Sequence, residues 1–239
     1  MSIAFGSATI PYNVAIGSLM YAMISTRPDI AFAVGLVSRH QQHPTLADHN
    51  AVRRIFKYID STSSTDIQYF SNQNNELVSH CDAEWAADNS DRKSTHGFVF
   101  LFGSGPVSWM SKKQTSISTS STESEYIAIA DAVREALWFR RLLSDLGLPP
   151  KRPTTIYCDN QAAINLVNNP VHHARMKHID VSLHFVRDHQ DHGNGTRSVS
   201  VIYCPTDIMI ADICTKSLPL ARHLKLWSLM NLKLPTLSS

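Results

Sequence analysis

Two apolar segments of the chain end in the same dipeptide, Cys-Asp, and a long helical pattern separates them. The segments are "ELVSHCD" at 76–82 and "TTIYCD" at 154–159, and the helical pattern runs over 121–146. Parallel neighbouring strands need a long crossover connection, usually a right-handed helix. The arrangement therefore predicts two parallel strands whose carboxyl ends bring Asp82 and Asp159 together.

Other short apolar runs complete an α/β pattern. We expect strands at "GFVFLF" (97–102), "VSWM" (107–110) and "VSVIY" (199–203), and helices over 161–169, 171–192 and 207–216. The order β-β-β-α-β-α-α-β-α predicts a mixed five-stranded sheet with helices packed on it.

The chain before residue 60 is predicted to be a separate small helical segment. Apolar residues run through "NVAIGSLMYAMIS" at 13–25, Pro28 can open a second helix, and Thr45 can cap a third. A polar stretch around one short strand follows. We therefore divide the chain into a helical segment (1–60), a linker (61–75), an α/β domain (76–218) and a loosely attached tail (219–239).

The stretch "STESEY" at 121–126 opens the long helix and holds two glutamates. At 100° per residue, Glu125 falls on the apolar stripe of the helix, and Glu123 falls about 160° away from it. A capping box with Ser120 explains Glu123, so we expect it on the solvent face, where replacement by Gln costs at most about 1 kcal/mol. A carboxylate on a buried face needs a partner charge or a metal ion, so Glu125 is the candidate for chemistry.

Four carboxylates are candidates for one site: Asp82, Glu125, Asp159 and Asp212, the last within "MIADICTK". Converging carboxylates repel each other unless a cation binds them, and oxygen ligands favour Mg²⁺ or Mn²⁺. Two such ions can activate a water and stabilise the leaving oxygen in phosphodiester hydrolysis. Each aspartate alone is also explained as a turn residue after a strand. The joint pattern, with Glu125 on a buried stripe, favours a metal site.

Four stretches match one protein family in order: "HCDAEWAADNSDRKSTHGFVF", "IYCDNQAAI", "HARMKHIDVSLHFVRD" and "IADICTKSL". They resemble the ribonuclease H domain of copia-type LTR retrotransposon Pol polyproteins. The opening "AIGSLMYAMISTRPDIAFAVGLVSRH" is similar to the thumb or connection segment that follows the reverse-transcriptase palm in the same polyproteins. The resemblance covers nearly the whole chain. It implies a ribonuclease H-like mixed five-stranded sheet with flanking helices, preceded by a small helical segment.

The resemblance also implies a hydrolase that cuts the RNA strand of RNA–DNA hybrids with two divalent ions, Mg²⁺ or Mn²⁺. By motif, the catalytic and metal-binding residues of the family fall on Asp82, Glu125, Asp159 and Asp212. No "YxDD" motif of the polymerase palm is present, so we expect no DNA synthesis. The usual "KSTSG" of the family reads "KSTHG", which is expected to place His96 in a turn near the site.

Polar residues beside the two aspartates are candidates for substrate contacts. Asn160 and Gln161, at a helix start, could reach the minor groove of a hybrid, and Arg92 and Lys93 could hold phosphates. Each is equally explained as a solvated surface residue. The histidines between 172 and 192 have no cysteine among them and match no zinc-finger or "HExxH" spacing, so zinc is disfavoured.

Composition limits the partners and the compartment only loosely. Lys and Arg number 22 against 20 Asp and Glu, and a net charge of +2 does not by itself indicate a nucleic-acid binder. Four scattered cysteines favour a reducing compartment. Without a signal peptide or a long apolar stretch, we expect no membrane contact and no secretion. We expect a monomer in isolation, in cytoplasmic virus-like particles or the nucleus.

Two hypotheses about function remain open. The first is an active ribonuclease H that acts on RNA–DNA hybrids beside the polymerase part of a Pol polyprotein during reverse transcription. The second is a catalytically silent fragment of a decayed retroelement that at most binds nucleic acid. Another metal-dependent nuclease or an integrase-like domain is weaker, because those share the sheet but not these flanking motifs.

Overall fold

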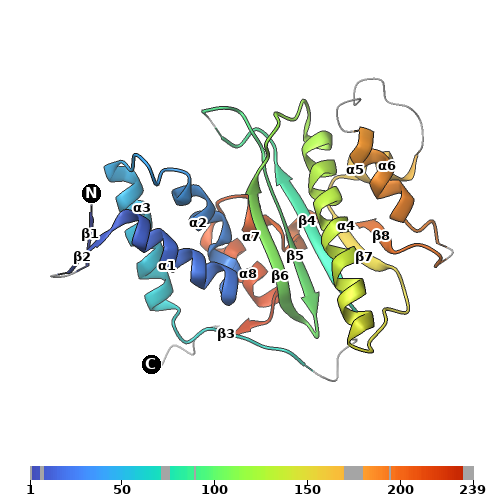
Figure 1. The fold of residues 1–239 in the computed structure, drawn as a ribbon, viewed down its shortest axis with the longest axis horizontal. Helices are drawn as coiled ribbons and strands as arrows, with labels where there is room; N and C mark the ends of the chain where they lie inside the picture. Colours follow the sequence, from blue (N-terminus) through green and yellow to red (C-terminus); the bar gives the residue numbers. More distant parts are fainter. Residues whose placement is uncertain are drawn as a thin grey trace.

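The centre of the fold is a five-stranded mixed sheet with strand order β6-β5-β4-β7-β8 (Figure 1). The structure is a computed structural model, and it describes residues 2–5, 8–70, 76–88, 90–169, 180–193 and 195–233. The strands are β4 (Val78–Glu84), β5 (Thr95–Phe102), β6 (Gly105–Lys113), β7 (Thr154–Cys158) and β8 (Val199–Tyr203). Strand β4 pairs antiparallel with β5 and parallel with β7, so the predicted parallel pairing of the two Cys-Asp strands is confirmed.

Three helices cover one face of this sheet: α4 (Ser121–Asp145), α5 (Gln161–Asn168) and α6 (Asp180–His189). Helix α4 lies between β6 and β7 in the chain and packs along β4, as the crossover prediction requires. Alternate strand residues, among them Cys81, Phe100 and Ile156, join its apolar stripe in one core. The predicted helix over 171–192 is confirmed for Asp180–His189, and His172, His173 and His178 lie outside the described residues.

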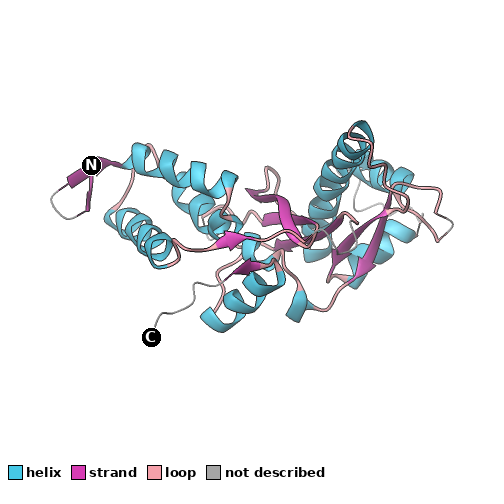
Figure 2. Ribbon diagram, turned by 90° about the horizontal axis from the view of Figure 1, so that it is seen from below, coloured by secondary structure: helices cyan, strands magenta, loops and turns pink. Residues whose placement is uncertain are grey.

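The opposite face of the sheet is covered by residues from both ends of the chain (Figures 1 and 2). The short helix α7 (Asp212–Thr215) and helix α8 (Leu220–Leu229) pack there. Leu226 and Trp227 of α8 are buried beside Val99 and Leu101 of β5. The expectation of a loosely attached tail is therefore wrong for residues 220–233, because the apolar side of α8 closes this core.

The N-terminal segment is helical, as predicted, and has a small core of its own. It contains β1 (Ser2–Phe5), β2 (Ala8–Pro11), α1 (Tyr12–Ser25), the 3₁₀ turn η1 (Pro28–Ile30), α2 (Ala31–Ser38) and α3 (Leu46–Ser61). Thr45 caps α3 in a reciprocal capping box with Asp48, so the predicted cap is confirmed. The segment packs against the sheet, where the indole of Trp109 on β6 donates to the Met23 carbonyl at 2.8 Å.

A buried polar network ties the helical segment to α8. Arg27 donates to both carboxylate oxygens of Asp29, at 3.0 and 2.8 Å, and Tyr58 donates to Asp29 at 2.7 Å. The Tyr58 hydroxyl also lies 3.0 Å from the His223 ring on α8. A buried ion pair of this kind fixes geometry when its remaining lone pairs are satisfied, as they are here.

A small two-stranded sheet, with two residues in each strand, further joins the segment after α3 to the segment after α8. Strand β3 (Asp66–Ile67) pairs antiparallel with β9 (Leu232–Lys233), so the short strand predicted in the linker is confirmed. The expected single helix over 207–216 is instead a 3₁₀ turn, η3 (Thr206–Ile208), followed by α7. Within the described residues, no helix is long and apolar enough to cross a membrane.

Candidate active site

Three of the four predicted carboxylates meet at one end of the sheet. Asp82 lies near the carboxyl end of β4, Asp159 directly follows β7, and Glu125 is the fifth residue of α4. Each of the three offers one oxygen atom, and these atoms lie within 4.8 Å of one another. The parallel pairing of β4 with β7 and the crossover through α4 bring the side chains together.

This acidic triad, Asp82, Glu125 and Asp159, fits a hard divalent cation. All of its donors are carboxylate oxygens, which Mg²⁺ and Mn²⁺ prefer. Two oxygens on opposite sides of a Mg²⁺ ion are about 4.2 Å apart, so the triad needs little contraction to share one ion. No ion pair with Lys or Arg joins Glu125 or Asp159 in the part of the chain that the structure describes.

Asp212, the fourth predicted carboxylate, lies beside the triad and is held by cations. It begins α7, where its Oδ1 atom is 3.0 Å from the Lys216 ammonium and its Oδ2 atom accepts from Arg222 at 2.9 Å. The same ammonium is 3.3 Å from Asp82 Oδ2. Lys216 therefore bridges Asp82 and Asp212. Asp82 belongs both to the triad and to this bridged pair.

Sequence reasoning missed three residues that contact Asp82 and Asp212. The Thr215 hydroxyl donates to Asp82 Oδ2, Lys216 bridges the two aspartates, and Arg222 reaches Asp212 from α8. The spacing from Asp212 to Lys216, four residues, is a helical signal for an ion pair. Arg222 had no such signal, because its role depends on how α8 folds back over the sheet.

Burial and crowding shape the protonation of the triad. Burial, helped by the neighbouring Asp212 and Asp159, raises the pKa of Asp82 to about 6, against the lowering effect of Lys216 and Thr215. Burial likewise raises the pKa of Glu125 well above its usual range, with Asp82 and Asp159 adding to the effect. Such shifts are typical of carboxylates that need a cation in order to be ionised together.

Glu123 is buried, so its predicted place on the solvent face is wrong. Its exposed fraction is 0%, and its carboxylate accepts from the backbone N–H of Thr119 at 2.8 Å and the Thr119 hydroxyl at 2.6 Å. Ser120 does accept from the Glu123 backbone N–H, as the capping prediction requires. Glu123 is buried because the loop before α4 packs against this side of the helix start. Thr119 of that loop contacts Glu123, and the Gln114 side chain donates to the Ser124 carbonyl at 3.0 Å.

The predicted substrate-binding residues surround the same end of the sheet. Arg92 and Lys93 lie in the connection from β4 to β5, where Arg92 is exposed and has a positive φ of 58°. Asn160 caps α5 by accepting from the Ala163 backbone N–H at 3.0 Å, and Gln161 is exposed beside it. Asn160 and Gln161 therefore follow directly on Asp159, whereas Arg92 and Lys93 lie in the connection shortly before β5.

His96 lies within strand β5 and not in a turn, so that expectation is wrong. It is 2% exposed, and its Nε2 atom is 2.9 Å from Asp131 Oδ2 on α4. The strand begins earlier than predicted, at Thr95, because β4 and β6 both pair with it along its whole length. His96 consequently joins α4 to the sheet.

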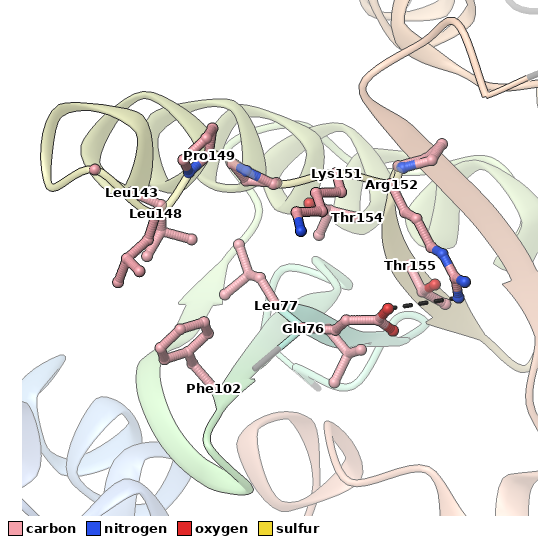
Figure 3. A pocket seen from close by; sticks show the side chains of 14 residues that line it. Glu76, Leu77, Phe102, Leu143, Leu148, Pro149, Lys151, Arg152, Thr154 and Thr155 are labelled. Carbon is pink, nitrogen blue, oxygen red and sulfur yellow. Dashed lines mark ion pairs between the residues drawn. The ribbon is translucent and has the colours of Figure 1, made fainter. Parts of the chain in front are cut away.

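A cavity of about 600 Å³ lies at the opposite end of the sheet (Figure 3). It is lined by the residues that begin β4 and β7 and by the turn after α4, and Arg152 and Glu76 form an ion pair of 3.6 Å at its side. Because β4 and β7 are parallel, this cavity is separated from the acids by the length of the strands.

Comparison with known proteins identifies the family. The chain is 42% identical over 212 residues to the retrovirus-related Pol polyprotein from transposon TNT 1-94 of Nicotiana tabacum, covering 89% of this chain and 16% of that protein. It is 39% identical over 211 residues to the Pol polyprotein from transposon RE1 of Arabidopsis thaliana, covering 88% of this chain and 14% of the relative.

A solved structure of LC11-RNase H1 in complex with an RNA/DNA hybrid matches 59% of this chain and 94% of its own, with a TM-score of 0.43 and 12% identity. No protein-family model matches the chain. The chain spans only 14% to 16% of the length of the two Pol polyproteins. Its sequence identity to them extends over both the helical segment and the five-stranded sheet, and the chain therefore belongs to the family of retrovirus-related Pol polyproteins from transposons.

Proposed function

We propose that this chain is the ribonuclease H part of a copia-type retrotransposon Pol polyprotein and hydrolyses the RNA strand of RNA–DNA hybrids. The observation that carries the proposal is the acidic triad, whose oxygens lie within 4.8 Å of one another at the carboxyl ends of two parallel strands. Family membership supports the same reaction class.

The residues of the triad have distinct parts in this proposal. Asp82, Glu125 and Asp159 would hold one divalent ion, Mg²⁺ or Mn²⁺, and Asp82 with Asp212 a second. The ions would supply an activated water and stabilise the leaving 3′ oxygen. Thr215 orients Asp82 through its hydroxyl, and the Thr206 hydroxyl, at 2.7 Å, orients Asp159. The backbone of α4 near its N-terminus holds Glu125 toward both aspartates.

Substrate binding in this proposal uses residues around the triad. Arg92 and Lys93 contact phosphates of the hybrid from the β4–β5 connection, which leaves the sheet beside Asp82. Asn160 and Gln161 face the minor groove from the start of α5, where 2′-hydroxyl groups distinguish RNA from DNA. A hybrid is read by its shape in this way rather than by its base sequence.

The helical segment over 1–60 is proposed to correspond to the thumb or connection part of the polyprotein, followed by the linker over 61–75. The polymerase part of a Pol polyprotein is the proposed partner, and reverse transcription in virus-like particles or the nucleus the proposed setting. No polymerase activity of the chain itself is proposed.

A cleavage assay tests the proposal. An RNA–DNA hybrid with labelled RNA is incubated with Mg²⁺ and the full chain, the Asp82→Asn variant, or the chain with excess chelator. We expect cutting of the RNA strand by the unmodified chain alone, with duplex DNA left intact. Equal cutting by Asp82→Asn would refute the site, and hybrid binding without cutting by any protein would favour the silent fragment.

A further inference from the structure

The Lys216 ammonium lies where two acids of the active site meet. It is 3.0 Å from Asp212 Oδ1, 3.3 Å from Asp82 Oδ2 and 3.7 Å from Glu84 Oε2. The side chains of Asp82 and Asp212 are only 3% and 4% exposed, so this contact is an ion pair inside the protein and not a surface pair. Charges paired in such surroundings interact more strongly than at an open surface.

The positive charges are distributed unevenly over the four acids. Asp212 has two cationic partners, Lys216 and Arg222, and Asp82 has one. Within the described residues, neither Glu125 nor Asp159 forms an ion pair with Lys or Arg. Among the described residues, Glu125 and Asp159 therefore lack a cationic partner, whereas the Asp82–Asp212 pair already holds one.

A divalent ion shared by Asp82 and Asp212 would compete with Lys216 for the same two oxygens. Lys216 has four rotatable bonds, and its side chain is 28% exposed, so the ammonium has a way out toward solvent. Arg222 is less free, because it also donates to the carbonyls of Thr206 and Asp207. Lys216 is consequently the less restrained of the two cations that contact Asp212.

We propose that Lys216 is a positioning residue that gates the second divalent ion of this site. In the chain without a second ion, the ammonium keeps Asp82 and Asp212 together. The first ion binds at the acidic triad with Lys216 in place, and the second binds between Asp82 and Asp212 only when the ammonium leaves them. The two ions therefore bind with clearly different affinities. The inference rests on the proposed function for the identity of the ions.

Calorimetric titration of the full chain with Mn²⁺ tests this, using four variants. Lys216→Met removes the charge but keeps a long side chain, and Lys216→Arg keeps the charge. Asp212→Asn removes the second-ion ligand. Lys225→Met is the matched control, because Lys225 also forms a lysine–aspartate pair, with Asp207 at 2.6 Å, but on the outer side of α8.

We expect one tight and one weak ion in the unmodified chain. Lys216→Met should lower the Kd of the second ion at least tenfold and leave the first within about threefold. Lys216→Arg and Lys225→Met should resemble the unmodified chain, and Asp212→Asn should lose the second ion alone. A merely structural role of Lys216 would weaken both ions together.

The gating role is overturned if Lys216→Met leaves the second Kd unchanged or raises it, or if the unmodified chain binds both ions equally. Hybrid cleavage, measured in parallel, separates this result from the proposed function. If the unmodified chain cleaves the hybrid but Lys216→Met binds Mn²⁺ with unchanged affinities, only the gating role of Lys216 is refuted. Ordered binding of two ions without cleavage refutes the nuclease and leaves the gate standing.

Discussion

The backbone of Gly97 lies directly against the side chain of Cys214. A Cβ atom on residue 97 would come within 2.8 Å of the Cys214 Cβ atom and would lie still closer to the Met110 carbonyl oxygen. Gly97 is also paired with Asp82 across the β4–β5 ladder. The absence of a side chain at this one position therefore allows α7, and with it Asp212, to approach the strand that carries Asp82.

Replacing Gly97 by Ala should consequently damage both stability and the site. Overpacking at a contact of this kind costs about 1–3 kcal/mol. We expect a loss of that size in the free energy of unfolding, measured in urea, and weaker Mn²⁺ binding at the Asp82–Asp212 pair. Gly17→Ala is the control: a Cβ atom added to Gly17 in α1 would meet no atom outside its own helix backbone within 4 Å, so this change should be neutral or gain up to about 1 kcal/mol. Equal effects of the two changes would contradict this reading.

The two glutamates at the start of α4 should respond in opposite ways. Glu125→Gln removes a charge that burial and the neighbouring aspartates disfavour, so stability without divalent ions should not fall, but hybrid cleavage should be lost. Glu123→Gln weakens buried hydrogen bonds with Thr119 and should cost about 1–3 kcal/mol while cleavage persists in the folded fraction. Urea unfolding and a cleavage assay measure both, and the reverse pattern would refute the assignment.

Arg92 should contribute to hybrid binding through charge alone. In an Asp82→Asn background, which prevents cutting, Arg92→Gln should weaken binding for every sequence. It should also flatten the slope of log K against log salt by about 0.9, the value for one phosphate contact. Arg141→Gln, an exposed change of equal charge near the far end of α4, should leave the slope unaltered. A slope that changes equally in both variants would indicate only long-range attraction.

The capping box of α3 should make stability depend on acid pH. Although partial burial raises the pKa of Asp48, hydrogen bonds from Thr45 and His40 outweigh this effect and lower it from 3.8 to about 2. Because the folded-state pKa is depressed, the stabilisation is present above pH 3.8 and is lost as the pH falls toward 2. Asp48→Asn should therefore cost about 1 kcal/mol at pH 5 and less at pH 3, as measured in urea. A difference that grows toward acid pH would contradict the sign.

The central part of the site could be predicted because it depends on local periodicity. Strand alternation and the Cys-Asp endings place Asp82 and Asp159, and a 100° helical repeat turns Glu125 toward them. Parallel pairing follows from the length of the crossover. None of these steps requires knowledge of what lies on the far face of the sheet.

The remaining features depend on packing between distant segments. A helical repeat gives the direction of Glu123 but not the loop that covers it. Leu224 and Trp227 are three residues apart, the spacing of one helix face, and this spacing is a signal for a packed helix in the tail. Where that helix docks, and hence the contact of Arg222 with Asp212, is set only once Trp227 enters the core beside β5.

The pairing of β3 with β9 has a consequence for steric access. The Asn231 side chain donates to the Ser104 carbonyl at 2.5 Å, and the Phe70 backbone N–H donates to the Gly103 carbonyl at 2.9 Å. The paired strands β3 and β9, here called the clasp, are therefore fixed to the β5–β6 turn. That turn is at the other end of β5 from Gly97 and the acids. The clasp itself therefore lies away from the acids, so it does not obstruct a duplex that approaches them as the proposed function requires.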